Sequence, residues 1–322
     1  MKISNLLLGI ITFLSLLLQP LTAKEIKPLY AMKTSGGFIS DVILDGDKIY
    51  VATDMGSVDI FALGSDTMIG QIMLEPTLSG RGVLIPTRIS RIDRRNGKTL
   101  IVSMGVDNYR NVWIEEGGKL RQIIDEEKKL LIREAHFVDD NRIVFGTFDA
   151  DIILYNISEG YKSYAKVNSQ STLSDLTLSN DAKTMVAADE SGVIRVYDVE
   201  GAKMIAEYDS QNVDKVYSVA YGNGVIVTGG EDRRVGVYRE GEKAYHLKTD
   251  FLVYAVGLSP NGKRGVYSDG EAQVLQLFDT KTKKKLDRLV GHKEIVHKII
   301  FISDYALISS GEQNELFFWK LN

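Results

Sequence analysis

Apolar and polar positions alternate with a period of two over short segments along most of this chain. Segments such as 193–197 and 235–238 carry β-branched and aromatic residues, which fit a pleated, half-buried surface. The segments that precede such strands, for example 49–52 and 225–228, are apolar on both faces, as strands inside stacked sheets are. Helical periodicity is confined to a single turn at 125–131. The pattern therefore predicts an all-β fold.

An aromatic residue recurs at nearly constant intervals through these strands. The successive gaps are 52, 42, 42, 41, 40 and 41 residues, between Phe61, Trp113, Tyr155, Tyr197, Tyr238, Phe278 and Trp319. A period near 40 is typical of a β-propeller, in which each four-stranded blade is one repeat. Turn sequences rich in Asn, Asp and Gly recur upstream with the same period, as at 96–97, 223–224 and 261–262. Such pairs mark tight hairpins, so the sequence predicts seven blades.

The repeat boundaries predict how the ring closes. The repeats cover about 38–74, 86–124, 132–168, 171–209, 214–250, 252–291 and 294–322. The seventh ends just after Trp319 and lacks an outermost strand, which we expect residues 27–34 to supply by pairing with the strand around Phe317. This closure would remove an open sheet edge. We therefore predict a seven-bladed β-propeller of four-stranded antiparallel blades, with the last blade closed by the N-terminal strand. A six-bladed or open ring is the alternative.

The first 23 residues have the composition of a cleavable signal peptide. A positive start at Met1-Lys2 is followed by an apolar stretch from Leu6 to Leu18 and a small residue at Ala23. The apolar stretch is shorter than the roughly 20 residues of a spanning helix. We therefore expect a signal peptide at 1–23, a single propeller domain at 24–322, and no membrane contact after cleavage.

Composition narrows the location and the partners. The chain has no cysteine, which excludes disulfides, cysteine-ligated clusters and cysteine-linked haem. An exported, cysteine-free chain of this length fits the bacterial periplasm, where we expect a monomer. The net charge of −4 becomes one unit more negative once Lys2 is removed, so nucleic acid is not expected as a partner.

Residues with catalytic or metal-binding chemistry are scattered. The four histidines, His136, His246, His292 and His297, fall in different repeats or at strand edges, whereas a zinc or copper site needs several clustered donors. Paired acids such as Asp45 and Asp47 have the residue types that tight turns require. We therefore predict no metal, no cofactor and no catalytic residue.

One region departs from the repeat. The gap between Phe61 and Trp113 is about ten residues longer than the others, which locates an insertion near 74–87. With the following strand it contributes five arginines: Arg81, Arg88, Arg91, Arg94 and Arg95. Inserted loops on rigid scaffolds often bind partners, and arginine is favoured at interfaces. Arg81, Arg88 and Arg91 are our candidate protein-interaction residues; a solvated loop is the alternative.

Several repeats share further motifs at fixed positions. The last repeat contains a Gly-His element at His292 and a terminal Trp319, and the fifth has an aspartate, Asp232, six residues before Tyr238. The same place is held in other repeats by Asp107 and Asp149. With these motifs the chain resembles the WD40 family over about residues 27 to 322, but no Trp-Asp dipeptide occurs and Gln313 stands where the last blade should have its Asp. The His–Asp network of the family is therefore expected to be mostly absent.

The resemblance implies an interaction platform rather than an enzyme. An exported, cysteine-free, WD40-like ring is also similar to the accessory proteins encoded with periplasmic nitrate reductases, which implies a molybdenum-containing nitrate reductase or its assembly machinery as partner. The expected function is a non-catalytic periplasmic protein-binding propeller that acts as an accessory or assembly factor. The alternatives are a scaffold for envelope assembly and a lactonase-like or quinoprotein-like enzyme.

Overall fold

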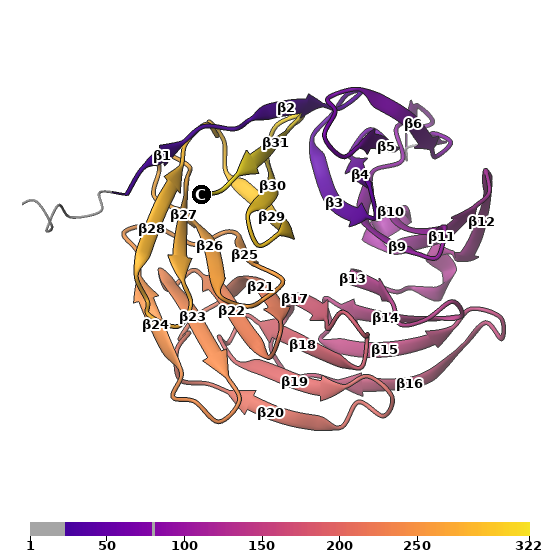
Figure 1. The fold of residues 1–322 in the computed structure, drawn as a ribbon. Coiled ribbons are helices and arrows are strands. Elements are labelled where there is room, and N and C mark those ends of the chain that lie inside the picture. The colour runs from indigo at the N-terminus through magenta and orange to yellow at the C-terminus, as the bar shows by residue number, and fades with distance from the viewer. Residues whose placement is uncertain (1–22, 79–80) are drawn as a thin grey trace, which may run out of the picture.

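Seven blades of antiparallel strands form a closed ring in the computed structural model, which describes residues 23–78 and 81–322 (Figure 1). The predicted signal peptide, 1–23, lies outside the described residues except for Ala23.

The strands of each blade run in sequence from the centre of the ring outward. Blades 1 and 2 contain β3 (Ile39–Asp45), β4 (Lys48–Thr53), β5 (Ser57–Ala62), β6 (Met68–Met73), β9 (Ile89–Arg95), β10 (Lys98–Met104), β11 (Arg110–Glu116) and β12 (Lys119–Ile124). Blades 3 and 4 contain β13 (Ile132–Phe137), β14 (Arg142–Thr147), β15 (Asp151–Asn156), β16 (Tyr161–Val167), β17 (Leu173–Leu178), β18 (Thr184–Asp189), β19 (Ile194–Asp198) and β20 (Met204–Tyr208).

The remaining blades follow the same order. Blade 5 contains β21 (Val216–Gly222), β22 (Val225–Gly230), β23 (Arg234–Arg239) and β24 (Tyr245–Lys248). Blade 6 contains β25 (Val256–Leu258), β26 (Arg264–Asp269), β27 (Val274–Asp279) and β28 (Lys285–Leu289), and blade 7 contains β29 (Val296–Ser303), β30 (Ala306–Gly311) and β31 (Glu315–Lys320). Two 3₁₀ turns, η1 (Val106–Asn108) and η2 (Glu126–Lys128), are the helical elements among the described residues, and η2 falls within the turn expected at 125–131.

The periodic aromatic residues all lie on the third strand of a blade. Each pairs across the sheet with a residue of the second strand, for example Phe61 with Ile49, Tyr238 with Ile226 and Trp319 with Leu307. All but Trp113 are buried. The period that appears in the sequence is therefore the repeat of one structural position, where a large ring fills the space between neighbouring blades.

The N-terminal segment closes the ring, as predicted. β2 (Tyr30–Lys33) is the fourth strand of blade 7 and pairs antiparallel with β31, with Ala31 opposite Phe317. The preceding β1 (Glu25–Ile26) adds a parallel fifth strand to the outer edge of blade 6, a contact that the sequence did not predict. Figure 1 shows this segment passing along β28 and then onto β31. It therefore ties the last two blades to the first.

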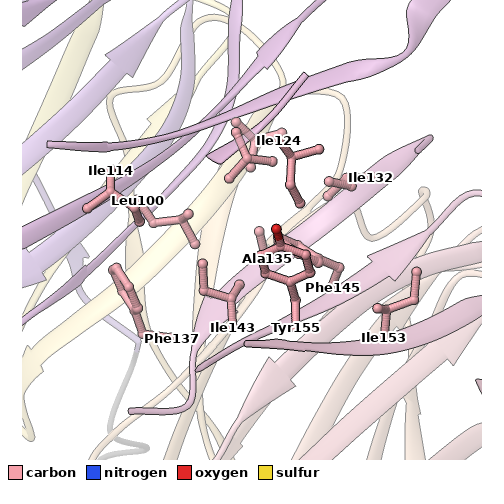
Figure 2. Packing of buried hydrophobic residues seen from close by; sticks show 12 residues of the cluster. Leu100, Ile114, Ile124, Ile132, Ala135, Phe137, Ile143, Phe145, Ile153 and Tyr155 are labelled. Atoms are coloured by element: carbon pink, nitrogen blue, oxygen red, sulfur yellow. The ribbon is translucent and has the colours of Figure 1, made fainter. Parts of the chain in front are cut away.

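The core consists of apolar layers between adjacent blades. Figure 2 shows the layer between blades 2 and 3, where Leu100, Ile114 and Ile124 of one blade meet residues of the next such as Phe137 and Phe145. The second strands are buried along most of their length, as the two-sided apolar segments predicted. This packing fixes the blades relative to one another and holds the channel at the centre of the ring.

In blades 5 and 7, a polar network links the loop before the blade to the blade's own strands. In blade 5 the Asn212 Oδ1 atom accepts hydrogen bonds from Thr228 and Tyr238, and the Asn212 amide donates to Asp232. These hydrogen bonds link the loop before blade 5 to the second and third strands of that blade.

In blade 7 the corresponding network contains a histidine, His292. His292 and the Trp319 indole both bond to the Ser309 hydroxyl, at 2.7 Å each, and the Gln313 amide reaches the other His292 nitrogen at 3.5 Å. Burial lowers the pKa of His292 to about 4. By contrast, Asp107 and Asp149 are exposed, with no side-chain hydrogen bond within the part of the chain that the structure describes.

Candidate functional site

The central channel is lined by the innermost strand of every blade and encloses a cavity of about 750 Å³. The third residue of each innermost strand faces it in six blades: Asp41, Arg91, Glu134, Asp175, Ser218 and Lys298. The equivalent residue of blade 6 is Ala255, which directly precedes β25. The alternation of a strand places one side chain per blade at this level, so the seven positions form a ring.

Two ion pairs occupy most of this ring. Lys298 of blade 7 contacts Asp41 of blade 1 at 2.8 Å, and Arg91 of blade 2 binds both carboxylate oxygens of Glu134 in blade 3 at 2.6 Å. Burial alone would raise the pKa of Asp41, but Lys298 and Arg91 outweigh it and hold that pKa below its ordinary value. In each pair a cation meets the acid of the blade that follows it.

Asp175 is the third acid of the ring, and it forms no ion pair among the described residues. Burial, together with the nearby Glu134 carboxylate, raises the pKa of Asp175 to about 6. Its neighbour Ser174 is buried and also lines the cavity, and the Ser174 hydroxyl has no hydrogen-bond partner in the described part of the chain. In this sector of the channel, the described residues therefore provide no ion-pair partner for the Asp175 carboxylate and no hydrogen-bond partner for the Ser174 hydroxyl.

The acids of the innermost strands also link the blades. Asp41, Asp93 and Asp175 each accept a hydrogen bond from a backbone N–H of the next blade's innermost strand, at 3.0, 2.6 and 2.6 Å. The donors are Ile92, Phe137 and Val219. These contacts give the acids a structural function that is independent of any ligand.

The insertion between blades 1 and 2 forms a short hairpin of β7 (Thr77–Leu78) and β8 (Leu84–Ile85). Its apolar side chains face solvent: Leu78, Val83, Leu84 and Ile85 are 69%, 60%, 66% and 44% exposed. Thr87 fastens the base of the hairpin by donating to the Glu75 carbonyl.

Two further exposed apolar residues, Phe38 and Met55, lie in blade 1 near the start of the insertion. Phe38 exchanges hydrogen bonds with Asp54, and Met55 follows in the same turn. A hydrogen bond links this turn to the start of the insertion, because the Leu74 N–H donates to the Gly56 carbonyl. We call these six residues, Phe38, Met55, Leu78, Val83, Leu84 and Ile85, the insertion patch.

The predicted interaction arginines separate into two groups. Arg81 and Arg88 are exposed, and Arg88 lines a groove of about 570 Å³ next to Phe38 and the acids Glu294 and Glu312. Arg91 instead points into the channel and pairs with Glu134. Arg94 and Arg95 pair with Asp45 and Asp140.

The remaining polar residues do not assemble into a metal site. Among residues 23–78 and 81–322, no group of three or more histidines and acids is placed to hold a metal ion. In the same ranges no helix has the length and apolarity to cross a membrane. The described residues thus provide two candidate sites, the charged central channel and the apolar insertion patch.

Comparisons with known proteins assign this chain to no family. No protein-family model matches the sequence, and no curated protein matches it. Its function must therefore be argued from the channel and the insertion.

Proposed function

We propose that this protein is a non-catalytic periplasmic propeller that binds another protein through the insertion patch. The observation that carries the proposal is the exposure of four apolar side chains in one inserted hairpin. Isolated exposed apolar residues are common, but contiguous apolar patches on a folded protein mark interaction surfaces. Phe38 and Met55 extend the patch onto the ring itself.

The charged residues beside the patch suit such an interface. Arg88 lies in the adjoining groove, and Arg81 lies in the hairpin; neither forms an ion pair in the described part of the chain. A guanidinium at the border of an apolar patch can pair with a partner's carboxylate. A rigid ring also presents such a loop at little entropic cost on binding.

For the partner, we propose a periplasmic reductase such as a molybdenum-containing nitrate reductase, which this propeller would assist as an accessory or assembly factor. This step rests on the resemblance in architecture, size and export signal. The alternative is that the propeller itself acts as a scaffold in envelope assembly.

Affinity capture from periplasm with a tagged protein tests the proposal. Wild-type protein should recover a reductase or its assembly component, whereas Leu84→Asp and the double variant Arg81→Glu/Arg88→Glu should lose that partner. Arg233→Glu is the matched control, because Arg233 is an exposed arginine in a turn of blade 5. Equal recovery by all four proteins would refute docking at the insertion.

The enzyme alternative has a separate test. Elemental analysis and an absorption spectrum of the purified mature protein would reveal a divalent metal or a quinone. A stoichiometric amount of either would overturn the non-catalytic proposal.

A further inference from the structure

The ring of third-position residues in the channel contains three acids and two cations. Asp41 and Glu134 each have a cation within ion-pair distance, supplied by the preceding blade. The blade before Asp175 carries Glu134 at this position, so the ring supplies no cation from that side, and Arg133 of the same blade binds the Ser174 backbone carbonyl rather than the Asp175 carboxylate. A buried carboxylate without a cation is costly, and here two of three are compensated.

The other basic groups of the channel bind partners other than the Asp175 carboxylate. Lys215 pairs with Glu190 at 2.7 Å. The Arg133 Nε atom donates to the backbone carbonyl of Ser174, and its guanidinium lies over the Phe148 ring at 5.0 Å. Neither group forms an ion pair with Asp175.

Small side chains leave room next to Asp175. The following blades carry Ser218 and Ala255 at the ring position, where blades 2 and 7 carry Arg91 and Lys298. Ser218 lies beside Asp175, because the Val219 N–H donates to the Asp175 carboxylate at 2.6 Å.

Two independent features of this part of the cavity favour a ligand that is positively charged and donates hydrogen bonds. Asp175 offers carboxylate oxygens, and the buried Ser174 hydroxyl next to it has no partner among the described residues. Tyr217 and Tyr254 line the same cavity with their rings stacked at 5.1 Å, and the Lys215 ammonium lies 5.9 Å from the Tyr217 centroid, as cations do beside aromatic faces.

We propose that this sector of the channel binds the primary ammonium group of a ligand. The ammonium donates to the Asp175 carboxylate and the Ser174 hydroxyl and completes the charge balance of the ring. A divalent metal ion would need several further oxygen ligands, whereas an ammonium needs one carboxylate and one or two neutral acceptors. The group can belong to a small free amine or to a lysine side chain of a bound protein.

Ligand-observed NMR with n-butylammonium chloride at pH 7.5 and constant ionic strength tests the site on the purified protein alone. Wild-type protein should bind n-butylammonium and leave the neutral n-butanol unbound. Asp175→Asn should weaken binding about tenfold or more, the effect of losing one charge-assisted hydrogen bond. Asp250→Asn, which changes an exposed acid, should bind as the wild type does.

A second variant keeps the test decisive if Asp175→Asn fails to fold. Ser218→Lys retains Asp175 and places an ammonium next to it within the chain, so it should abolish n-butylammonium binding. Binding equal to wild type in Ser218→Lys, or no binding by the wild type itself, would overturn the proposal.

Capture experiments then identify the source of the ammonium. If a partner's lysine fills the site, saturating n-butylammonium and Ser218→Lys should both reduce capture of that partner. If a free amine fills it, capture should be unchanged while the NMR result stands. The amine site does not depend on the insertion patch, so its failure would leave the proposed function intact.

Discussion

Closure of the ring by the N-terminal strand can be tested at Met32. This side chain is fully buried in β2 and packs in a cluster that includes Ile49, Phe61 and Leu316. Truncation of a buried methionine to alanine costs about 2–5 kcal/mol, through lost apolar burial and the cavity left behind. We therefore expect Met32→Ala to lower the free energy of unfolding by about 3 kcal/mol.

The magnitude sets the assay. With an unfolding entropy of about 2.1 cal/mol/K per residue over roughly 300 residues, a loss of 3 kcal/mol lowers Tm by about 5 °C. Urea unfolding followed by circular dichroism gives the free energy, and calorimetry gives Tm. Lys33→Ala is the control, because Lys33 is the exposed neighbour in the same strand and should change stability by less than about 0.5 kcal/mol.

Equal stability of Met32→Ala and Lys33→Ala would refute docking of β2 on blade 7. An engineered disulfide checks the register independently. Lys33 lies opposite Glu315, and the chain has no cysteine of its own. Lys33→Cys combined with Glu315→Cys should therefore form a single disulfide and raise Tm under oxidising conditions only. Failure of this pair to oxidise would contradict the observed register.

Two further predictions concern the buried polar groups. Glu134→Gln leaves the Arg91 guanidinium without its anionic partner and should lower the free energy of unfolding in urea by about 3 kcal/mol. The control Arg88→Ala should lower it by less than about 0.5 kcal/mol. Equal losses in the two variants would show that the Arg91–Glu134 pair does not stabilise the fold. The pKa of His292 is lowered to about 4 by burial, so the unfolded chain binds a proton more readily between pH 6.5 and 4. The contribution of neutral, buried His292 to the free energy of unfolding is therefore complete above pH 6.5 and falls by up to about 3 kcal/mol as the pH decreases towards 4. The free energy of unfolding of His292→Gln should depend less on pH across this range than that of the wild type. An equal pH dependence in the two proteins would contradict the lowered pKa of His292.

Much of the fold follows from local sequence. The period-two alternation and the turn residues act over a few positions, so the strands and hairpins around Tyr197 and Tyr238 were predictable. The truncated last repeat predicted that residues 27–34 complete blade 7, and β2 confirms it. The parallel addition of β1 to blade 6 was not predictable, because two residues carry no pattern.

The candidate site was predictable only in part. The long gap between Phe61 and Trp113 pointed to the exposed arginines of the insertion, but it grouped Arg91 with them. Its position as the third residue of a repeat, equivalent to Asp41 and Lys298, was the signal that could have placed it in the channel.

The sequence by itself thus determined the number of blades, their strand order and the strand that closes the ring, because each depends on short-range periodicity and on a regular repeat. The tertiary structure alone decided which charges meet. Asp41 and Lys298 lie at opposite ends of the chain, and Arg91 and Glu134 in separate repeats, so their pairing requires the blades to pack around one axis. The same packing leaves Asp175 beside Ser218 without an ion-pair partner in the described part of the chain, because only the closed ring sets which side chains share the channel.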